Sequence, residues 1–109
     1  MTMNEAILSL IPKMKEIYGE ALEAVVLYGS VARGTETEES DVDIALLLRG
    51  KTEKEQFDRM IRCTAELELE CGRVLSVMPL NSERFHEWED ILPFYRNIRN
   101  EGVVLWQAA

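Results

Sequence analysis

The chain has 109 residues, 47% of them apolar, and its 20 acidic against 12 basic residues give a formal net charge of −8. This size supports one hydrophobic core but not a catalytic domain with a separate substrate domain, so we expect a single domain over residues 1–109. The acidic balance excludes a general nucleic-acid binder, because phosphate backbones require a basic footprint. No apolar run is long enough to span a bilayer, and the N-terminus lacks a signal-peptide pattern.

The predicted elements are, in chain order, a helix over 2–18, a strand over 24–28, a short helix over 30–33, an acidic and mobile surface loop over 35–40, a strand over 42–48, a helix over 54–69, a strand over 73–80 ended by Pro79, a short acidic helix capped by residue 81 or 82, a helix over 91–98, and a strand over 103–106. Thr2 and Glu5 form a capping-box pattern. Pro12 is expected to kink the first helix or to begin a new one. The order of elements predicts an α/β (α+β) fold in which helices pack against a small mixed sheet.

Cys63 and Cys71 lie in one predicted helix, about 12 Å apart along its axis, which is too far for a disulfide. Neither has a second cysteine or a histidine at metal-ligand spacing. We therefore expect reduced thiols in a cytoplasmic protein. The single histidine, His86, lies in a charged segment and is expected on the surface rather than in a catalytic site.

The ends of the first two predicted strands carry the residues with chemical potential. The first strand leads into Gly29-Ser30, and the second begins with Asp41-Val42-Asp43. Because side chains alternate along a strand, Asp41 and Asp43 point to the same face. Two adjacent carboxylates repel each other unless a cation lies between them, and Mg²⁺ prefers such oxygen ligands together with water and substrate phosphates. Gly29 allows the backbone to approach a ligand closely, and Ser30 adds a hydroxyl, so a nucleotide with a divalent metal is the simplest occupant.

Gly29-Ser30, followed after ten residues by Asp41-x-Asp43, resembles the signature of the DNA polymerase beta-like nucleotidyltransferase superfamily. The flanking Ala32-Arg33-Gly34 and Ser40 resemble its small prokaryotic branch, the minimal nucleotidyltransferases. The segment 93–102 is similar to the end of many such domains, so the likeness covers about residues 22–105. The competing interpretations are an ordinary turn with two strand-capping acids, and an unrelated acidic domain.

The resemblance implies a polymerase beta-like core and transfer of a nucleoside monophosphate, with AMP from ATP favoured over other nucleotides, to a hydroxyl group. Asp41 and Asp43 would be catalytic and would bind Mg²⁺, or alternatively Mn²⁺. Gly29 and Ser30 would hold the nucleotide phosphates, and Arg33 would contact phosphate or, with equal weight, pair with the acidic loop. Such domains often act as antitoxins that modify a tyrosine of a HEPN-type toxin, so a HEPN partner is expected; self-association is left open.

Families of this kind usually supply a third carboxylate from the later strand, and here residues 73–79 contain no acid. Strand alternation leaves Leu75 or Ser76 to face the metal pair, and Glu70 and Glu83 are expected to lie too far away. Two hypotheses follow. The chain is either an enzyme whose base comes from a partner, or a weak or inactive nucleotide-binding module that neutralises a HEPN partner by complex formation.

Overall fold

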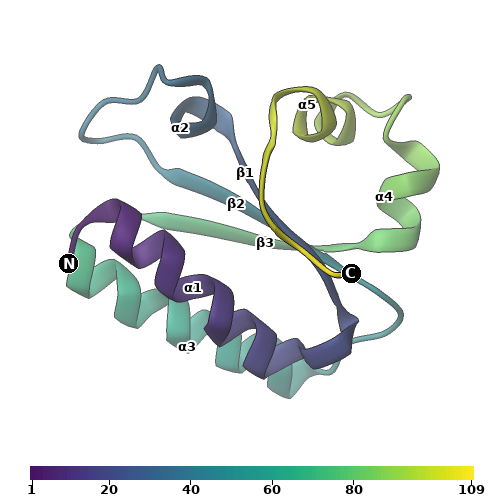
Figure 1. The fold of residues 1–109 in the computed structure, drawn as a ribbon, viewed down its shortest axis with the longest axis horizontal. Coiled ribbons are helices and arrows are strands. Elements are labelled where there is room, and N and C mark those ends of the chain that lie inside the picture. The colour runs from purple at the N-terminus through teal and green to yellow at the C-terminus, as the bar shows by residue number, and fades with distance from the viewer.

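The computed structural model describes residues 1–109 and contains one four-stranded sheet with the order β3-β2-β1-β4 (Figure 1). Strand β1 is antiparallel to both of its neighbours, β2 and β4, whereas β2 and β3 are parallel. The elements are α1 (Met3–Tyr18), the short 3₁₀ helix η1 (Gly19–Ala21), β1 (Leu22–Tyr28), α2 (Gly29–Arg33), β2 (Val42–Leu48), α3 (Lys54–Cys71), β3 (Leu75–Asn81), α4 (Ser82–Trp88), α5 (Pro93–Glu101) and β4 (Val103–Gln107). The predicted mixed sheet with packed helices is confirmed.

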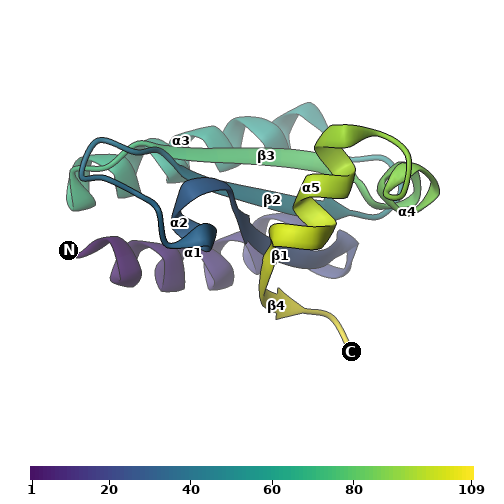
Figure 2. The same ribbon diagram turned by 90° about the horizontal axis from the view of Figure 1, so that it is seen from above.

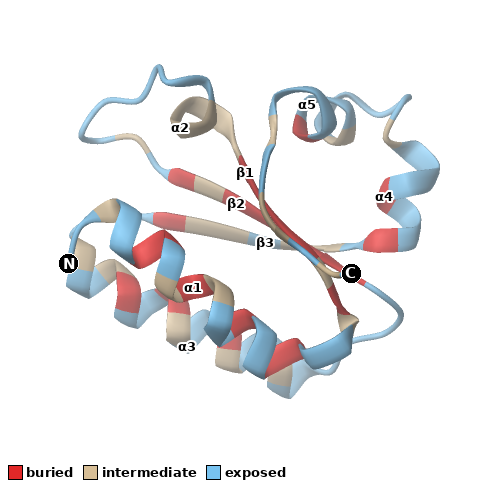
Figure 3. Cartoon of the chain, viewed as in Figure 1, coloured by how far each residue is buried: buried red, intermediate tan, exposed pale blue.

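Helices cover the sheet on both faces, as the two perpendicular views show (Figure 1 and Figure 2). Helices α1 and α3 lie against one face and enclose the larger core, which includes Leu10, Met14 and Met60. Phe85 of α4 and Ile98 of α5 pack on the opposite face over a smaller core. The buried residues follow β1 and β2 and form stripes along α1 and α3 (Figure 3). Strand β1 is therefore central and covered on both faces, as its apolar run predicts.

Helix α1 is continuous through Pro12, so the predicted new helix start at this residue is wrong. Pro12 cannot donate to the carbonyl of Leu8 four residues earlier, and Leu8 lies on the exposed side of the helix, where the loss of this bond is tolerated. The predicted capping box is present: Thr2 N donates to Glu5 Oε1 at 2.9 Å, and Glu5 N donates to Thr2 Oγ1 at 3.1 Å. The N-terminal end of α1 thus follows from local sequence.

Strand β3 continues through Pro79 to Asn81, so the predicted end at Pro79 is also wrong. The strand is at the edge of the sheet and pairs only with β2, and a proline is tolerated there where its missing N–H would face the open side. The remaining boundaries differ from the predictions by at most three residues. Pro93 explains one of these shifts, since proline is favoured at the first position of a helix and α5 begins there.

Cys63 and Cys71 are both free thiols, as predicted. None of the helices combines the length and the apolar character that crossing a bilayer would require.

Candidate active site

The end of β1 and the start of β2 bring a backbone turn and a carboxylate into direct contact. Tyr28 pairs with Asp43 across the two strands, and the chain then turns at Gly29 into α2. Gly29 has φ +76°, which disfavours any residue with a Cβ. A Cβ at this position would also overlap Asp43 Oδ2 and lie 3.1 Å from Asp43 Cγ. Glycine is therefore favoured for two reasons, the backbone angle and the closeness of the Asp43 side chain.

The two aspartates form a pair of like charges. Asp43 is half-buried and Asp41 is exposed. Burial and then the charge of Asp41 raise the pKa of the Asp43 carboxyl, and Arg33 offsets part of this effect. The structure contains no group of three or more His, Cys, Asp or Glu side chains that could hold a metal ion. Two carboxylates beside an open surface still fit Mg²⁺, because this ion commonly takes only one or two protein carboxylates and completes its shell with water and phosphate.

Arg33 lies at the end of α2 and pairs with Glu101 of α5, with 3.0 Å between Arg33 Nη1 and Glu101 Oε2. The alternative prediction, an ion pair between Arg33 and the acidic loop 36–39, is therefore wrong. The tertiary structure places α5 beside α2 (Figure 1), and no local pattern in the sequence indicates that neighbour. Arg33 nevertheless remains near enough to the aspartate pair for its charge to offset part of the rise in the pKa of Asp43.

The register of β2 and β3 decides which residue takes the place of the third carboxylate. Asp43 pairs with Ser76, and Leu75 pairs with Val42. Leu75 is only 4% exposed and belongs to the core under α1 and α3, so it points away from the aspartates. Ser76 is thus the residue of β3 beside Asp43, and it offers a hydroxyl in place of an acid.

Two residues near the aspartates, Tyr28 and Met78, have no role in the predictions from sequence. The rings of Tyr28 and Phe94 meet edge to face at 6.0 Å between centroids, and burial and the Asp43 charge raise the pKa of Tyr28. Met78 pairs with Ala45 two positions beyond the Asp43–Ser76 pair, and both Met78 and Phe94 are partly exposed apolar side chains. Only Tyr28 carried a usable signal, since it directly precedes Gly29.

Comparison with known proteins identifies the family. The family model for "Polymerase beta, Nucleotidyltransferase" matches residues 11–108. The "Putative protein adenylyltransferase MJ0604" of Methanocaldococcus jannaschii is 34% identical over 109 residues, and the match covers 97% of this chain and all of that protein.

Two solved structures have the same fold. A toxin–antitoxin complex with AMP-PNP contains a chain with a TM-score of 0.61 and 20% identity, covering 92% of this chain and 73% of that one. A mutant of the toxin–antitoxin pair MntA-HpeT contains a chain with a TM-score of 0.61 and 18% identity over the same shares. At these identities the structural likeness bears on the fold, whereas the family follows from the match over residues 11–108 and from the full-length relative. The chain belongs to the polymerase beta nucleotidyltransferase family, and its enzyme class is nucleotidyltransferase.

Proposed function

We propose that this chain is a metal-dependent adenylyltransferase that transfers AMP from ATP to a hydroxyl group of a protein partner. The observation that carries the proposal is the contact of Gly29 with Asp43, because it brings a glycine turn suited to phosphate and a metal-binding carboxylate to one place. The full-length relative from Methanocaldococcus jannaschii, which is named as a protein adenylyltransferase, supports AMP as the group and protein as the acceptor. We treat residues 1–109 as one nucleotidyltransferase domain with its core at about 22–105.

Asp41 and Asp43 are the proposed catalytic residues and the ligands of Mg²⁺, with Mn²⁺ as the alternative ion. Bound metal would stabilise the charge that develops on the attacking and leaving oxygens. Ser30 and the first N–H groups of the turn after Gly29 would orient the phosphates, since N–H groups at the start of a helix have no partner within it. Arg33 has a planar fork suited to phosphate oxygens and would contact them by exchanging its bond with Glu101.

In the proposed reaction the acceptor oxygen forms a bond to the α-phosphorus of ATP, the bond to pyrophosphate breaks, and the acceptor hydroxyl loses its proton. Ser76 cannot act as the carboxylate base that this family usually supplies from β3. We therefore assign the base to the partner, whose side chains would complete the site.

The partner we propose is a HEPN-type toxin, with this chain acting as its antitoxin in the cytoplasm. Two solved structures with the same fold are toxin–antitoxin complexes, and one of them is described with AMP-PNP, an analogue of ATP. The net charge of −8 is compatible with a basic protein partner and opposes a nucleic-acid acceptor.

The test is incubation of the chain with labelled ATP, Mg²⁺ and the HEPN-type protein encoded beside it, followed by intact-mass analysis of both chains. We expect one or more AMP units on the partner, lost with Asp41→Asn. Glu39→Gln is the matched control, because it also removes an acid two positions before that site and should leave transfer intact. Transfer that survives Asp41→Asn would overturn the proposed site.

A binding module is the second candidate, favoured by one observation: Ser76 stands where an acid is expected. In this case the same experiment would give a tight complex with no change in mass, while nucleotide would still bind.

A further inference from the structure

We propose that Arg73, although it is not one of the two proposed metal ligands, is the positioning residue that holds Asp41 in place for metal binding. The inference rests on the proposed function, in which Asp41 is a metal ligand. Asp41 is exposed and lies just before the first residue of β2, so the sheet alone does not hold it. The loop before Asp41 was predicted to be a mobile surface loop, and the contacts of Arg73 indicate that its last part is fastened.

Arg73 reaches from the segment before β3 to two carbonyl groups of this loop. Arg73 Nη2 donates to Ser40 O at 3.0 Å and to Thr37 O at 3.3 Å. One planar guanidinium nitrogen that serves two carbonyls requires a fixed direction of approach, which the compact and flexible ammonium group of lysine does not provide in the same way.

The part of the loop that Arg73 binds is itself a closed turn. Ser40 N donates to Thr37 O at 3.1 Å, and Thr37 N donates to Ser40 Oγ at 2.9 Å. The two hydroxyl groups lie 3.2 Å apart, so the pair is joined by side chains as well as by backbone. Arg73 therefore binds a turn that is already ordered by its own hydrogen bonds. Because Ser40 is the last residue of this turn, the position of the turn determines the position of the next residue, Asp41.

Both peptide groups that flank Asp41 are bound to consecutive residues of the neighbouring segment. The carbonyl before Asp41 belongs to Ser40 and accepts from Arg73, and the N–H after Asp41 belongs to Val42 and donates to Val74 O at 2.9 Å. The first of these bonds depends on a side chain and can be removed by mutation, whereas the second is the start of the β2–β3 pairing. Of the two hydrogen bonds that flank Asp41, only the one from Arg73 can therefore be removed by a point mutation.

Burial of Arg73 Nε indicates that this support is built in and not a chance surface contact. Arg73 Nε is buried without a hydrogen-bond partner and is the one side-chain nitrogen or oxygen in the chain with that status. An unpaired buried donor is unfavourable, so the bonds of Nη2 to the loop must offset it. A smaller residue at position 73 would avoid this cost but would lose both bonds to the loop.

The test measures the Mg²⁺ concentration that gives half-maximal binding of AMP-PNP to the full chain. Arg73→Met should raise this concentration about tenfold, the lower end of the usual effect of removing a residue that orients a metal ligand, and Arg73→Lys should have an intermediate effect. Binding at saturating Mg²⁺ should return to the parent level, which a general loss of folded protein would not allow. Arg59→Met is the matched control, because Arg59 pairs with Glu16 on the α1–α3 side and touches no part of the loop.

Hydrogen exchange supplies a readout that does not depend on nucleotide. A peptide covering residues 36–43 should exchange faster in Arg73→Met and Arg73→Lys, with α1 and α4 unchanged. An unchanged Mg²⁺ dependence in Arg73→Met, which removes every donor to the loop, would overturn the inference. Asp41→Asn separates the two proposals: if it leaves Mg²⁺-dependent binding intact, the proposed function fails, and if it abolishes that binding while both Arg73 variants behave as the parent, only the positioning role fails.

Discussion

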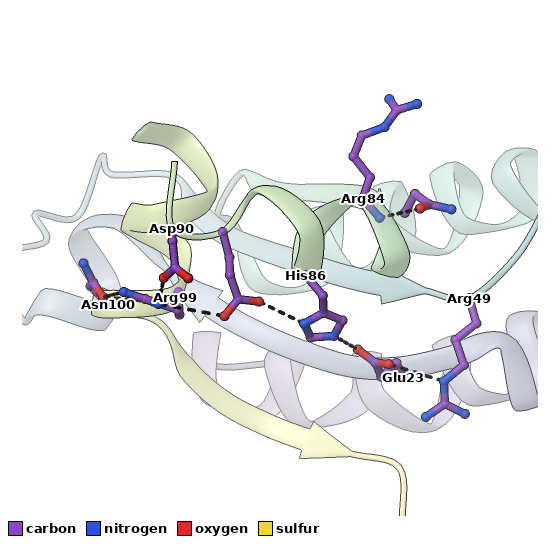
Figure 4. Close-up of polar contacts among 9 residues, drawn as sticks. Glu23, Arg49, Arg84, His86, Asp90, Arg99 and Asn100 are labelled. Atoms are coloured by element: carbon purple, nitrogen blue, oxygen red, sulfur yellow. Dashed lines mark hydrogen bonds and ion pairs between the residues drawn. The ribbon is translucent and has the colours of Figure 1, made fainter. Parts of the chain in front are cut away.

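Two clusters of carboxylates lie on this sheet, and the structure treats them in opposite ways. In the first, His86 of α4 bridges Glu23 of β1 and Glu89 (Figure 4). His86 Nε2 lies 2.7 Å from Glu23 Oε2, and His86 Nδ1 lies 2.9 Å from Glu89 Oε2. Arg49 pairs with the outer side of Glu23 at 3.4 Å, and Arg99 lies 4.0 Å from Glu89 and also pairs with Asp90. Every acid in this cluster has a cationic or ionisable partner.

The ionisation of the first cluster reflects this balance. Burial alone would raise the pKa of Glu23, but hydrogen bonds from His86 and Ser82 outweigh it and lower that pKa. The hydrogen bonds to Glu23 and Glu89 raise the pKa of His86. The cluster joins α4 to β1, and it needs no ligand. His86 is on the surface, as predicted, but its contacts make it structural.

The second cluster, Asp41 with Asp43, is left unbalanced. Arg33, whose charge acts on Asp43, is already paired with Glu101, and the pKa of Asp43 is raised instead of lowered. The same chain therefore neutralises acids where they hold the fold together and leaves them unpaired beside the glycine turn. This contrast favours a bound cation as the missing partner of Asp41 and Asp43.

The largest effect on nucleotide binding is expected when the charges of Asp41 and Asp43 are removed. Asp41→Asn with Asp43→Asn should reduce Mg²⁺-dependent nucleotide binding at least about a hundredfold, since even residues that only orient metal ligands are worth 10–100-fold. Because the pKa of Asp43 is raised above its ordinary 3.8, ionisation of Asp43 opposes folding once the pH exceeds that value. The double variant should therefore melt no lower than the parent at neutral pH. Isothermal titration and thermal unfolding check the two parts, and Glu36→Gln with Glu38→Gln is the control with equal charge.

Gly29→Ala tests whether the contact with Asp43 matters beyond backbone strain. Gly50→Ala is the matched control, because Gly50 has φ +66° and no atom within 4 Å of a new Cβ, whereas the Cβ at Gly29 would meet Asp43. Both variants should lose about 1–2 kcal/mol of stability from the left-handed backbone, and Gly29→Ala should lose more because its Cβ must displace Asp43. Only Gly29→Ala should weaken nucleotide binding. Equal binding by both variants would show that the turn and the carboxylate act independently.

Ser76→Asp would extend the unbalanced cluster to three acids. If a base is missing at this position, the rate of AMP transfer to the partner should rise. A well-positioned base contributes about a hundredfold or more, and an aspartate introduced without refinement should give at least about tenfold. Leu75→Asp is a poor substitute because Leu75 is buried in the core. No gain in a Ser76→Asp variant with normal melting would support the proposed assignment of the base to the partner. Initial rates of AMP transfer are the measurement.

The smallest effect is expected at the balanced cluster. Because the folded pKa of His86 lies above its ordinary 6.5, its ion pairs contribute fully below that pH, and the contribution is lost as the pH rises through the folded pKa. His86 is half-exposed, so solvent limits the contribution to about 0.5 kcal/mol. The parent should therefore lose stability relative to His86→Gln as the pH rises above about 6.5, with nucleotide binding unaffected. A parallel pH dependence of the two proteins would contradict the role of this cluster.

The sequence by itself determined the elements and the chemistry within each of them. Helical and alternating patterns are local, so α1, β1, β2 and α3 were located to within a few residues, and the spacing of Gly29-Ser30 and Asp41-x-Asp43 was enough for the family. Alternation along one strand also fixed which residues of that strand share a face. The same local rules overestimated how strongly Pro12 and Pro79 interrupt their helix and strand. The cost of a proline depends on whether the lost hydrogen bond faces solvent or an open sheet edge.

Only the tertiary structure decided what lies across from each of these residues. Strand alternation left Leu75 and Ser76 equivalent, and the parallel register of β2 with β3 selected Ser76. The partner of Arg33 on α5 and the hold of Arg73 on Ser40 each join residues more than 30 positions apart. Such contacts arise from packing of distant segments over a shared core, and no short-range pattern encodes them.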